Sequence, residues 1–201
     1  MQLIIITTDT FFDQEAEAIN ALCSEGVQTL HIRKPQSTKD QLELLLKQIN
    51  PIFMNRLVLH DHFDLVQQFG LKGYHLNRRN KVVQEKADKS VSASCHSFKE
   101  LQTKATCDYL FLSPIFNSLS KPGYQQAFSE KELFQAKKDQ WINKKVYALG
   151  GITPSNIPLL KTYGFGGVVV LGFLWGNLIE NRDLTGLIKR LRELQKAIES
   201  I

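Results

Sequence analysis

Short apolar runs recur along the chain at a spacing that is typical of strands alternating with helices. The first run, Leu3–Thr7, is apolar up to its last residue, which predicts a strand buried on both faces. It is followed by Gln14–Ser24, where apolar residues recur at helical spacing as far as Gly26. The same pattern predicts seven more strands: Thr29–Arg33, Arg56–His60, Gly73–Leu76, Val91–Cys95, Tyr109–Leu112, Val146–Leu149 and Gly166–Gly172.

Helices are expected between most of these strands. Thr38 is a suitable N-cap for a helix through Gln48, whose apolar stripe we predict to comprise Leu42, Leu44, Leu45 and Ile49. The polar segment Asn77–Lys89 shows no clear pattern. Further helices are predicted at Asp61–Phe69, Ser97–Thr103, Glu130–Gln140 and Leu184–Ile198.

Eight strand–helix alternations in 201 residues predict a single domain, residues 1–201, built on a parallel sheet. Eight repeats favour closure into an α/β fold of the (β/α)8 TIM-barrel type, with a phosphate-binding site. An open doubly wound sheet remains the alternative, because periodicity alone does not establish closure.

Composition narrows the class of protein. The chain is 43% hydrophobic and 22% charged, as in ordinary globular proteins, and no apolar run reaches the roughly 18–20 residues of a membrane span. Its three cysteines and the absence of a signal-peptide pattern predict a cytoplasmic protein. The net charge of +5 fits either phosphorylated ligands or spare surface lysines. Aromatic residues do not interleave with a basic patch, so neither nucleic acid nor a membrane is an expected partner.

Glycines follow the last two predicted strands. Gly150 and Gly151 come directly after Val146–Leu149, and Gly172 ends the next apolar run. Thr153 and Pro154 then have the character of a helix N-cap and first helical residue. Because helix N-termini after strands seven and eight bind phosphate in many (β/α)8 barrels, these glycines predict a phosphate site. The alternative is that they only form tight turns.

Polar residues gather where the predicted strands end, which is where barrels carry their chemistry. A single histidine there would more often pack in the core, but several converging polar groups predict a site. Alternation along the second strand puts His31 and Arg33 on one face, so both are expected to point into the barrel mouth. The full set comprises His31, Arg33, His60, Asp61, His75, Asn77, Ser94, His96, Ser113, Ser118, Ser120, Lys121, Gly150, Gly151 and Gly172.

Seven short segments, in order along nearly the whole chain, resemble the thiamine-phosphate synthase / TenI family. No single segment is decisive, but the ordered set is specific. The segments are Leu30–Arg33, Leu57–Asp61, Gly73–Leu76, Ser94–His96, Tyr109–Phe116, Ser118–Lys121, and Ala148–Ile152 with the Gly172 turn.

The resemblance implies a thiamin-biosynthesis barrel that binds a thiazole phosphate, and a homodimer is expected at the level of the family. The phosphate would lie near Gly151 and Gly172, with Ser118 and Ser120 close to the ligand. The family has two chemistries. The synthase joins the thiazole phosphate to a hydroxymethylpyrimidine diphosphate with Mg²⁺ and releases pyrophosphate. The TenI branch aromatises a thiazole carboxylate phosphate tautomer by a proton shift that needs no cofactor.

The chain departs from the synthase pattern on the side of the pyrimidine diphosphate. Pro35 stands where the synthase has a lysine, and Asn80 stands where it has a second acidic ligand of Mg²⁺. Asp61 is retained as a metal ligand, if a Mg²⁺ site is retained at all. The neighbouring Arg78 and Arg79 either bind pyrophosphate in place of a metal ion or are solvated surface residues.

These departures favour the thiazole tautomerase as the first hypothesis. In it, His96 is the general acid and base, and Arg33 and Lys121 contact the anion. The alternative is a synthase with a remodelled Mg²⁺ site at Asp61, and a third hypothesis is a non-catalytic thiazole-phosphate sensor. The predicted substrate-binding residues are Ser94, Ser118, Ser120, Gly150, Gly151, Gly172, His31 and His60.

Overall fold

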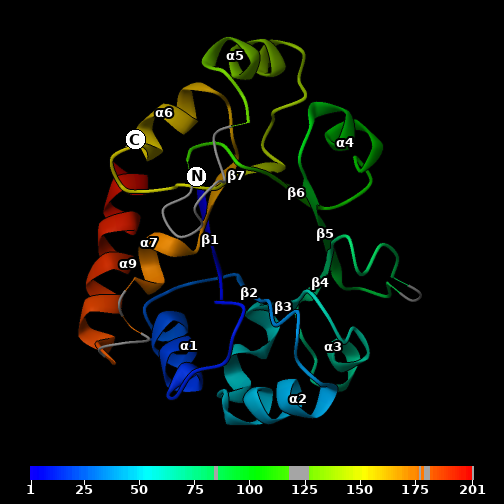
Figure 1. Cartoon of the computed structure of the whole chain (residues 1–201), viewed down its shortest axis with the longest axis vertical. Coiled ribbons are helices and arrows are strands. Elements are labelled where there is room, and N and C mark those ends of the chain that lie inside the picture. The colour runs from blue at the N-terminus through cyan, green and yellow to red at the C-terminus, as the bar shows by residue number, and fades with distance from the viewer. Residues whose placement is uncertain (84–85, 118–126, 177, 179–181, 201) are drawn as a thin grey trace.

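Eight parallel strands close into one barrel in the computed structural model of the chain, which describes residues 1–83, 86–117, 127–176, 178 and 182–200 (Figure 1). Each strand pairs with the next in sequence, and β1 pairs with β8. The barrel prediction is therefore confirmed, and the open doubly wound sheet is wrong. The strands are β1 (Gln2–Ile6), β2 (Leu30–Ile32), β3 (Leu57–Leu59), β4 (Gly73–Leu76), β5 (Ser90–Cys95), β6 (Tyr109–Leu112), β7 (Val146–Leu149) and β8 (Gly167–Val170).

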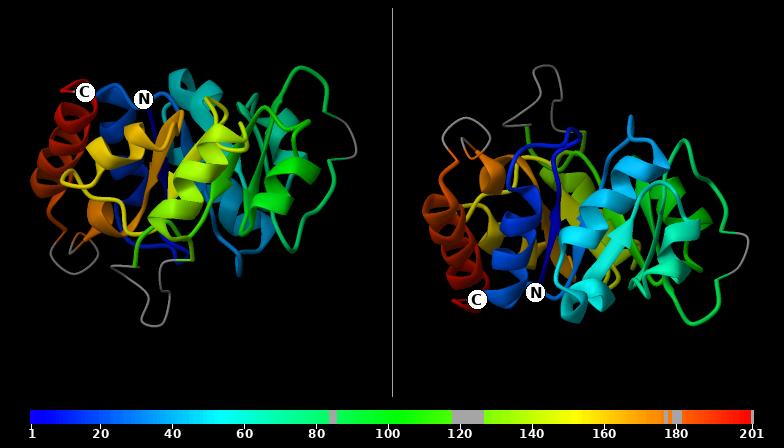
Figure 2. Two further views of the ribbon diagram at one scale, coloured as in Figure 1. Left: turned by 90° about the horizontal axis from the view of Figure 1, so that it is seen from above. Right: turned by 90° about the horizontal axis from the view of Figure 1, so that it is seen from below.

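Helices form a ring around this barrel, as the end-on and turned views show (Figures 1 and 2). The long C-terminal helix α9 (red) lies beside α1 (blue) and also contacts α6 and α7. None of the described helices is long and apolar enough to cross a membrane. The helices are α1 (Glu15–Ser24), α2 (Lys39–Gln48), the 3-10 helix η1 (Pro51–Arg56), α3 (Asp64–Gln68), α4 (Phe98–Thr103), α5 (Glu130–Lys138), α6 (Ile157–Thr162), α7 (Gly172–Trp175) and α9 (Leu184–Glu199).

The register of the strands decides which side chains enter the barrel. Ile6 is paired with His31, and His75 with Ser92, so the alternation of each strand carries these positions onto the inner face together. A small apolar cluster, distinct from the large core between strands and helices, fills the inside of the barrel. It comprises Ile4, Ile6, Phe111, Tyr147 and Val169.

The predicted apolar stripe of the second helix is wrong at one position. Leu44 is 59% exposed, whereas its neighbour Leu46 is fully buried. Residues three and four apart share a helix face, so the buried stripe comprises Leu42, Leu45, Leu46 and Ile49, and Leu44 points away from it.

The helix after β7 begins later than predicted. Helix α6 starts at Ile157 with Asn156 as its N-cap, not at Thr153 and Pro154. The Asn156 side chain explains the difference: its Oδ1 accepts from the Thr153 N–H at 3.0 Å, and its Nδ2 donates to the Gly151 carbonyl at 2.8 Å. These bonds hold the segment after Gly151 as a turn before the helix starts.

Candidate active site at the carboxyl ends of the strands

Three histidines from different strands fill the barrel interior just below its mouth. His31 lies on β2, His75 on β4, and His60 directly after β3, and all three are buried. His31 Nδ1 lies 3.0 Å from His60 Nε2, and His31 Nε2 lies 2.8 Å from the Tyr109 hydroxyl. The rings of His60 and His75 stack with centroids 4.1 Å apart. His31 therefore lies beneath the mouth, inside a hydrogen-bonded cluster.

Burial keeps these imidazoles uncharged. Desolvation lowers the pKa of His31 and His60 well below that of a free histidine, and it lowers the pKa of His75 to about 3. For His60, the neighbouring rings and then the guanidinium groups of Arg33 and Arg79 lower the pKa further. A neutral imidazole has one donor and one acceptor nitrogen, so the cluster offers polar contacts without charge.

The three rings do not form a metal site. Their nitrogens lie within 4.8 Å of one another, as a metal site requires. However, the His60 and His75 rings are nearly parallel, at 22°. An imidazole binds a metal through a lone pair in its own plane, and two stacked rings cannot both aim such lone pairs at one ion. Both nitrogens of His75 also lie 2.8 Å from hydroxyls, those of Ser92 and Ser94. The predicted substrate-binding Ser94 thus belongs to the histidine cluster.

Asp61 lies at the rim, at the end of β3, and both its carboxylate oxygens are hydrogen-bonded. Arg79 donates to it through two nitrogens, Nε and Nη2, each at 2.9 Å. Asn80 donates to it through its amide Nδ2, also at 2.9 Å. Asp61 is therefore bonded both to Asn80, which stands where the synthase has a second acid, and to Arg79, one of the two neighbouring arginines.

Across the mouth, His96 follows β5 and its ring reaches the end of β6. The ring nitrogen Nδ1 lies 3.1 Å from the Ser113 carbonyl oxygen and 3.3 Å from the Ser113 hydroxyl. Only an N–H can donate to a carbonyl, so this contact places the ring hydrogen on Nδ1. Nε2 then carries the lone pair, and His96 is exposed at the mouth. This arrangement suits a proton acceptor.

Arg33 follows β2, and its side chain is only weakly held. The backbone N–H of Arg33 donates to the Thr7 hydroxyl, and the guanidinium lies 3.7 Å from Asp9. Its neighbour Lys34 points away from the mouth: its Nζ donates to Glu15 at 2.6 Å, and both side chains are almost fully buried. Arg33 is therefore the cation available on this side of the mouth.

The glycines after β7 adopt the backbone that was predicted from their residue type. Gly150 has φ +103° and Gly151 has φ +64°, and a side chain at Gly151 would come within 2.3 Å of the Asn117 carbonyl. Gly172 opens the four-residue helix α7 directly after β8. The predicted residues Ser118, Ser120 and Lys121 lie outside the described residues.

Sequence reasoning missed two features of the site. Tyr109 enters the histidine cluster although it begins a strand, because it is paired with Ser92, and residue order alone gives no signal of this pairing. The buried Lys34–Glu15 pair had no signal, because an acid in the first turn of a helix is usually solvated.

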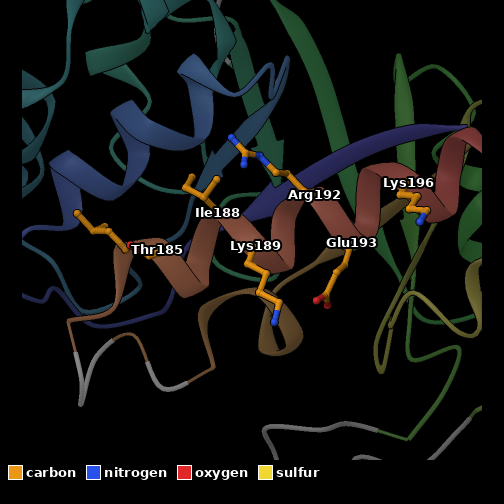
Figure 3. A pocket seen from close by; sticks show the side chains of 7 residues that line it. Thr185, Ile188, Lys189, Arg192, Glu193 and Lys196 are labelled. Carbon is orange, nitrogen blue, oxygen red and sulfur yellow. The ribbon is translucent and has the colours of Figure 1, made fainter.

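A groove of about 620 Å³ is lined by residues of α9 (Figure 3). No histidine or cysteine lines it, so it lacks the acid–base groups of the barrel mouth. The side chains come from one face of the helix: Leu184, Thr185, Ile188, Lys189, Arg192, Glu193 and Lys196.

Comparison with known proteins gives matches over most of the chain. The family described as thiamine monophosphate synthase matches residues 3–174. The thiamine-phosphate synthase of Flavobacterium johnsoniae is 26% identical and covers 96% of this chain and 95% of its own. A solved structure described as thiamine phosphate pyrophosphorylase from Bacteroides thetaiotaomicron is 39% identical, with a TM-score of 0.89 over 99% of this chain and 98% of its own.

Bacteroides thetaiotaomicron supplies a second relative, a thiamine-phosphate synthase that is only 20% identical over 99% of both chains. The present chain is more similar to the protein of the solved structure.

Proposed function

The chain belongs to the thiamine monophosphate synthase family, and on that premise we propose that it is a thiamine-phosphate synthase. It would join a thiazole phosphate to a hydroxymethylpyrimidine diphosphate and release pyrophosphate. One observation carries the proposal: relatives described as thiamine-phosphate synthase or thiamine phosphate pyrophosphorylase cover 96% and 99% of the chain. The sequence alone placed the tautomerase first, and the names of the relatives favour the synthase instead.

The mouth has the charge that such substrates need. Both substrates are anions, and negative charge develops on the leaving pyrophosphate as its bond breaks. Fixed cations stabilise such charge best where water is partly excluded. Arg33 and Arg79 supply guanidinium groups on the rim, and Gly151, which follows β7, leaves bare backbone where a phosphate would lie.

A second candidate, the thiazole tautomerase, is favoured by the contacts of Asp61. An acid that is bound to Arg79 and Asn80 is poorly placed to hold the metal ion of a synthase. In this reaction His96 Nε2 would accept and return the proton that moves.

The test is product formation by the purified full-length chain. It would receive thiazole phosphate and pyrimidine diphosphate, once with Mg²⁺ and once with a chelator, and thiamin phosphate would be separated by chromatography. Formation of thiamin phosphate under either condition supports the synthase. Its absence under both conditions rejects it.

A parallel sample with the carboxylated thiazole tautomer then separates the remaining hypotheses. Aromatisation of that compound would identify the tautomerase. Binding of thiazole phosphate without either reaction would leave the non-catalytic sensor as the remaining hypothesis. Light scattering of the same sample checks the homodimer, which stays a prediction.

A further inference from the structure

The turn that carries Arg79 is hydrogen-bonded to the end of β3, and these bonds hold Arg79 beside Asp61. Asn77 and Asn80 both donate a side-chain N–H to the His60 carbonyl, at 2.7 and 2.9 Å. The Asn77 side-chain oxygen accepts from the Arg79 backbone N–H at 2.9 Å. The turn is therefore tied to the end of β3, and Arg79 is held beside Asp61 by its backbone as well as by its charge.

The contacts of Asp61 occupy three of the roughly four lone pairs of its carboxylate, and the pair that remains on Oδ2 lies beside the Arg79 guanidinium. Mg²⁺ takes about six oxygen ligands at about 2.0–2.1 Å in octahedral geometry. Here both oxygens of Asp61 accept N–H groups from Arg79, and Asn80 presents its amide nitrogen rather than its oxygen. A guanidinium so close also repels a divalent cation. The residues present at Asp61 do not fit the Mg²⁺ that the family implies.

The same arrangement suits an anion. A guanidinium has five N–H donors in a planar fork that matches phosphate, and two of them are used on Asp61. The Arg79 side chain is 42% exposed, so the remaining donors are accessible. Asp61 fixes the orientation of the fork, which lowers the entropy lost when a ligand binds.

Arg33 is a second cation on the same rim. It follows β2, and Arg79 follows β4, and these two strands flank β3 in the barrel. The Arg33 side chain is 27% exposed, and its only ion pair in the described part of the chain is the 3.7 Å contact with Asp9. Arg33 is therefore available to an anion that Arg79 binds at this rim.

We propose that Arg79, held by Asp61 and its turn, takes the place of a divalent cation and binds a pyrophosphate group directly. The proposed function supplies the identity of this anion, and the binding itself needs no turnover. The chain therefore binds pyrophosphate without any divalent cation, whereas a carboxylate-lined metal site would not.

The experiment is calorimetric titration of inorganic pyrophosphate into the full chain, in excess chelator and again with Mg²⁺. We expect binding in chelator, with an affinity that Mg²⁺ does not improve. Arg79→Gln should weaken binding in chelator about tenfold or more, since a charge-assisted bidentate contact is lost. Arg78→Gln is the matched control, because Arg78 is exposed and makes no ion pair within the described residues.

Arg79→Lys serves if the glutamine variant fails to fold, because it keeps the charge and loses the fork. It should weaken binding by a smaller factor than glutamine. Binding that requires Mg²⁺, or equal affinity in the Arg78 and Arg79 variants, overturns the proposal. Pyrophosphate binding in chelator without thiamin phosphate formation would reject the synthase and keep this inference. Synthesis and pyrophosphate binding that both strictly require Mg²⁺ would support the synthase and reject this inference.

Discussion

His31 and His60 share one hydrogen inside the barrel, because His31 Nδ1 lies 3.0 Å from His60 Nε2. Of two neutral imidazoles in such a contact, one donates and the other accepts. The hydroxyl of Tyr109 lies 2.8 Å from the other nitrogen of His31. A hydrogen placed on any one of these groups therefore fixes the hydrogens of the others, and the cluster works as a unit only while its rings stay neutral.

The buried histidines predict that the protein loses stability in mild acid. Their pKa values are lowered in the folded state, that of His75 to about 3, whereas the unfolded chain protonates them below about pH 6.5. Unfolding at pH 5 should therefore take up protons at these rings. Glu15, whose pKa is raised to about 7, releases most of one proton and opposes them.

The free energy of unfolding should accordingly be highest near neutral pH and fall as the pH is lowered towards 5, with each ring contributing up to about 1.4 kcal/mol per pH unit. Urea unfolding at a series of pH values measures this slope. His96→Gln, which alters an exposed ring, should leave it unchanged. A free energy of unfolding that is flat between pH 7 and pH 5 would show that the three rings are not neutral and buried as described.

The Lys34–Glu15 pair predicts a large and asymmetric effect on stability. The Lys34 ammonium donates to Glu15 and to the carbonyls of Thr8 and Thr10, so all three of its hydrogens are used. Lys34→Met leaves a buried carboxyl without its partner and should cost about 3–5 kcal/mol. Adding Glu15→Leu removes that carboxyl, and the double variant should be more stable than Lys34→Met. Urea unfolding of Lys34→Met and of the double variant measures this difference. A double variant that is no more stable than Lys34→Met would contradict the prediction.

Much of the fold could be predicted because each strand is short, apolar and followed by a polar break. Strands β4, β6 and β7 lie where the pattern placed them. The start of α6 was wrong because Thr153 and Pro154 are good local helix signals, and only the folded loop brings Asn156 against Gly151. This contact outweighs the local helix propensity of Thr153 and Pro154, because the Asn156 side chain satisfies two backbone groups at once.

The candidate site was predictable in its location but not in its pairings. Strand ends meet at one rim in any parallel barrel, so Arg33, Asp61 and His96 were expected there. The contact of Asp61 with Arg79 spans 18 positions and depends on a turn in a segment without pattern. The depth of His31 depends on the register between strands, which is a property of the closed barrel. Neither could be derived from residue order alone.

His96 predicts a difference between the two candidate reactions. Its Nδ1–H is held by the Ser113 carbonyl, and Nε2 is left as the proton acceptor. His96→Gln should lower aromatisation of the thiazole tautomer by about 10²–10⁴-fold, the usual contribution of general acid–base catalysis. Thiamin phosphate formation should fall by a smaller factor, because fixed charge dominates that step. Ser113→Ala is the control, since it keeps the carbonyl and removes only the longer contact at 3.3 Å. Equal losses in both reactions would argue against a proton-transfer role.

Gly151 and Gly70 form a natural matched pair for testing the phosphate site. Their φ angles are +64° and +63°, so an alanine at either position meets the same left-handed backbone, at a cost of about 1–2 kcal/mol. Gly70 has open space around it, whereas a side chain at Gly151 would meet Phe116 and the Asn117 carbonyl. Any side chain at Gly151 therefore displaces the loop that faces it, and Gly151→Asp adds a negative charge where the phosphate is expected.

Titration of thiazole phosphate by calorimetry, with thermal unfolding on the same samples, separates the two effects. Gly70→Ala should lower the melting temperature and leave affinity unchanged. Gly151→Ala should lower both, and Gly151→Asp should abolish binding, because the carboxylate repels the phosphate at close range. If Gly151→Asp bound thiazole phosphate as well as Gly151→Ala did, the phosphate would lie elsewhere. Gly172, which opens the short helix α7 after β8, would then be the other predicted position for the phosphate within the described residues.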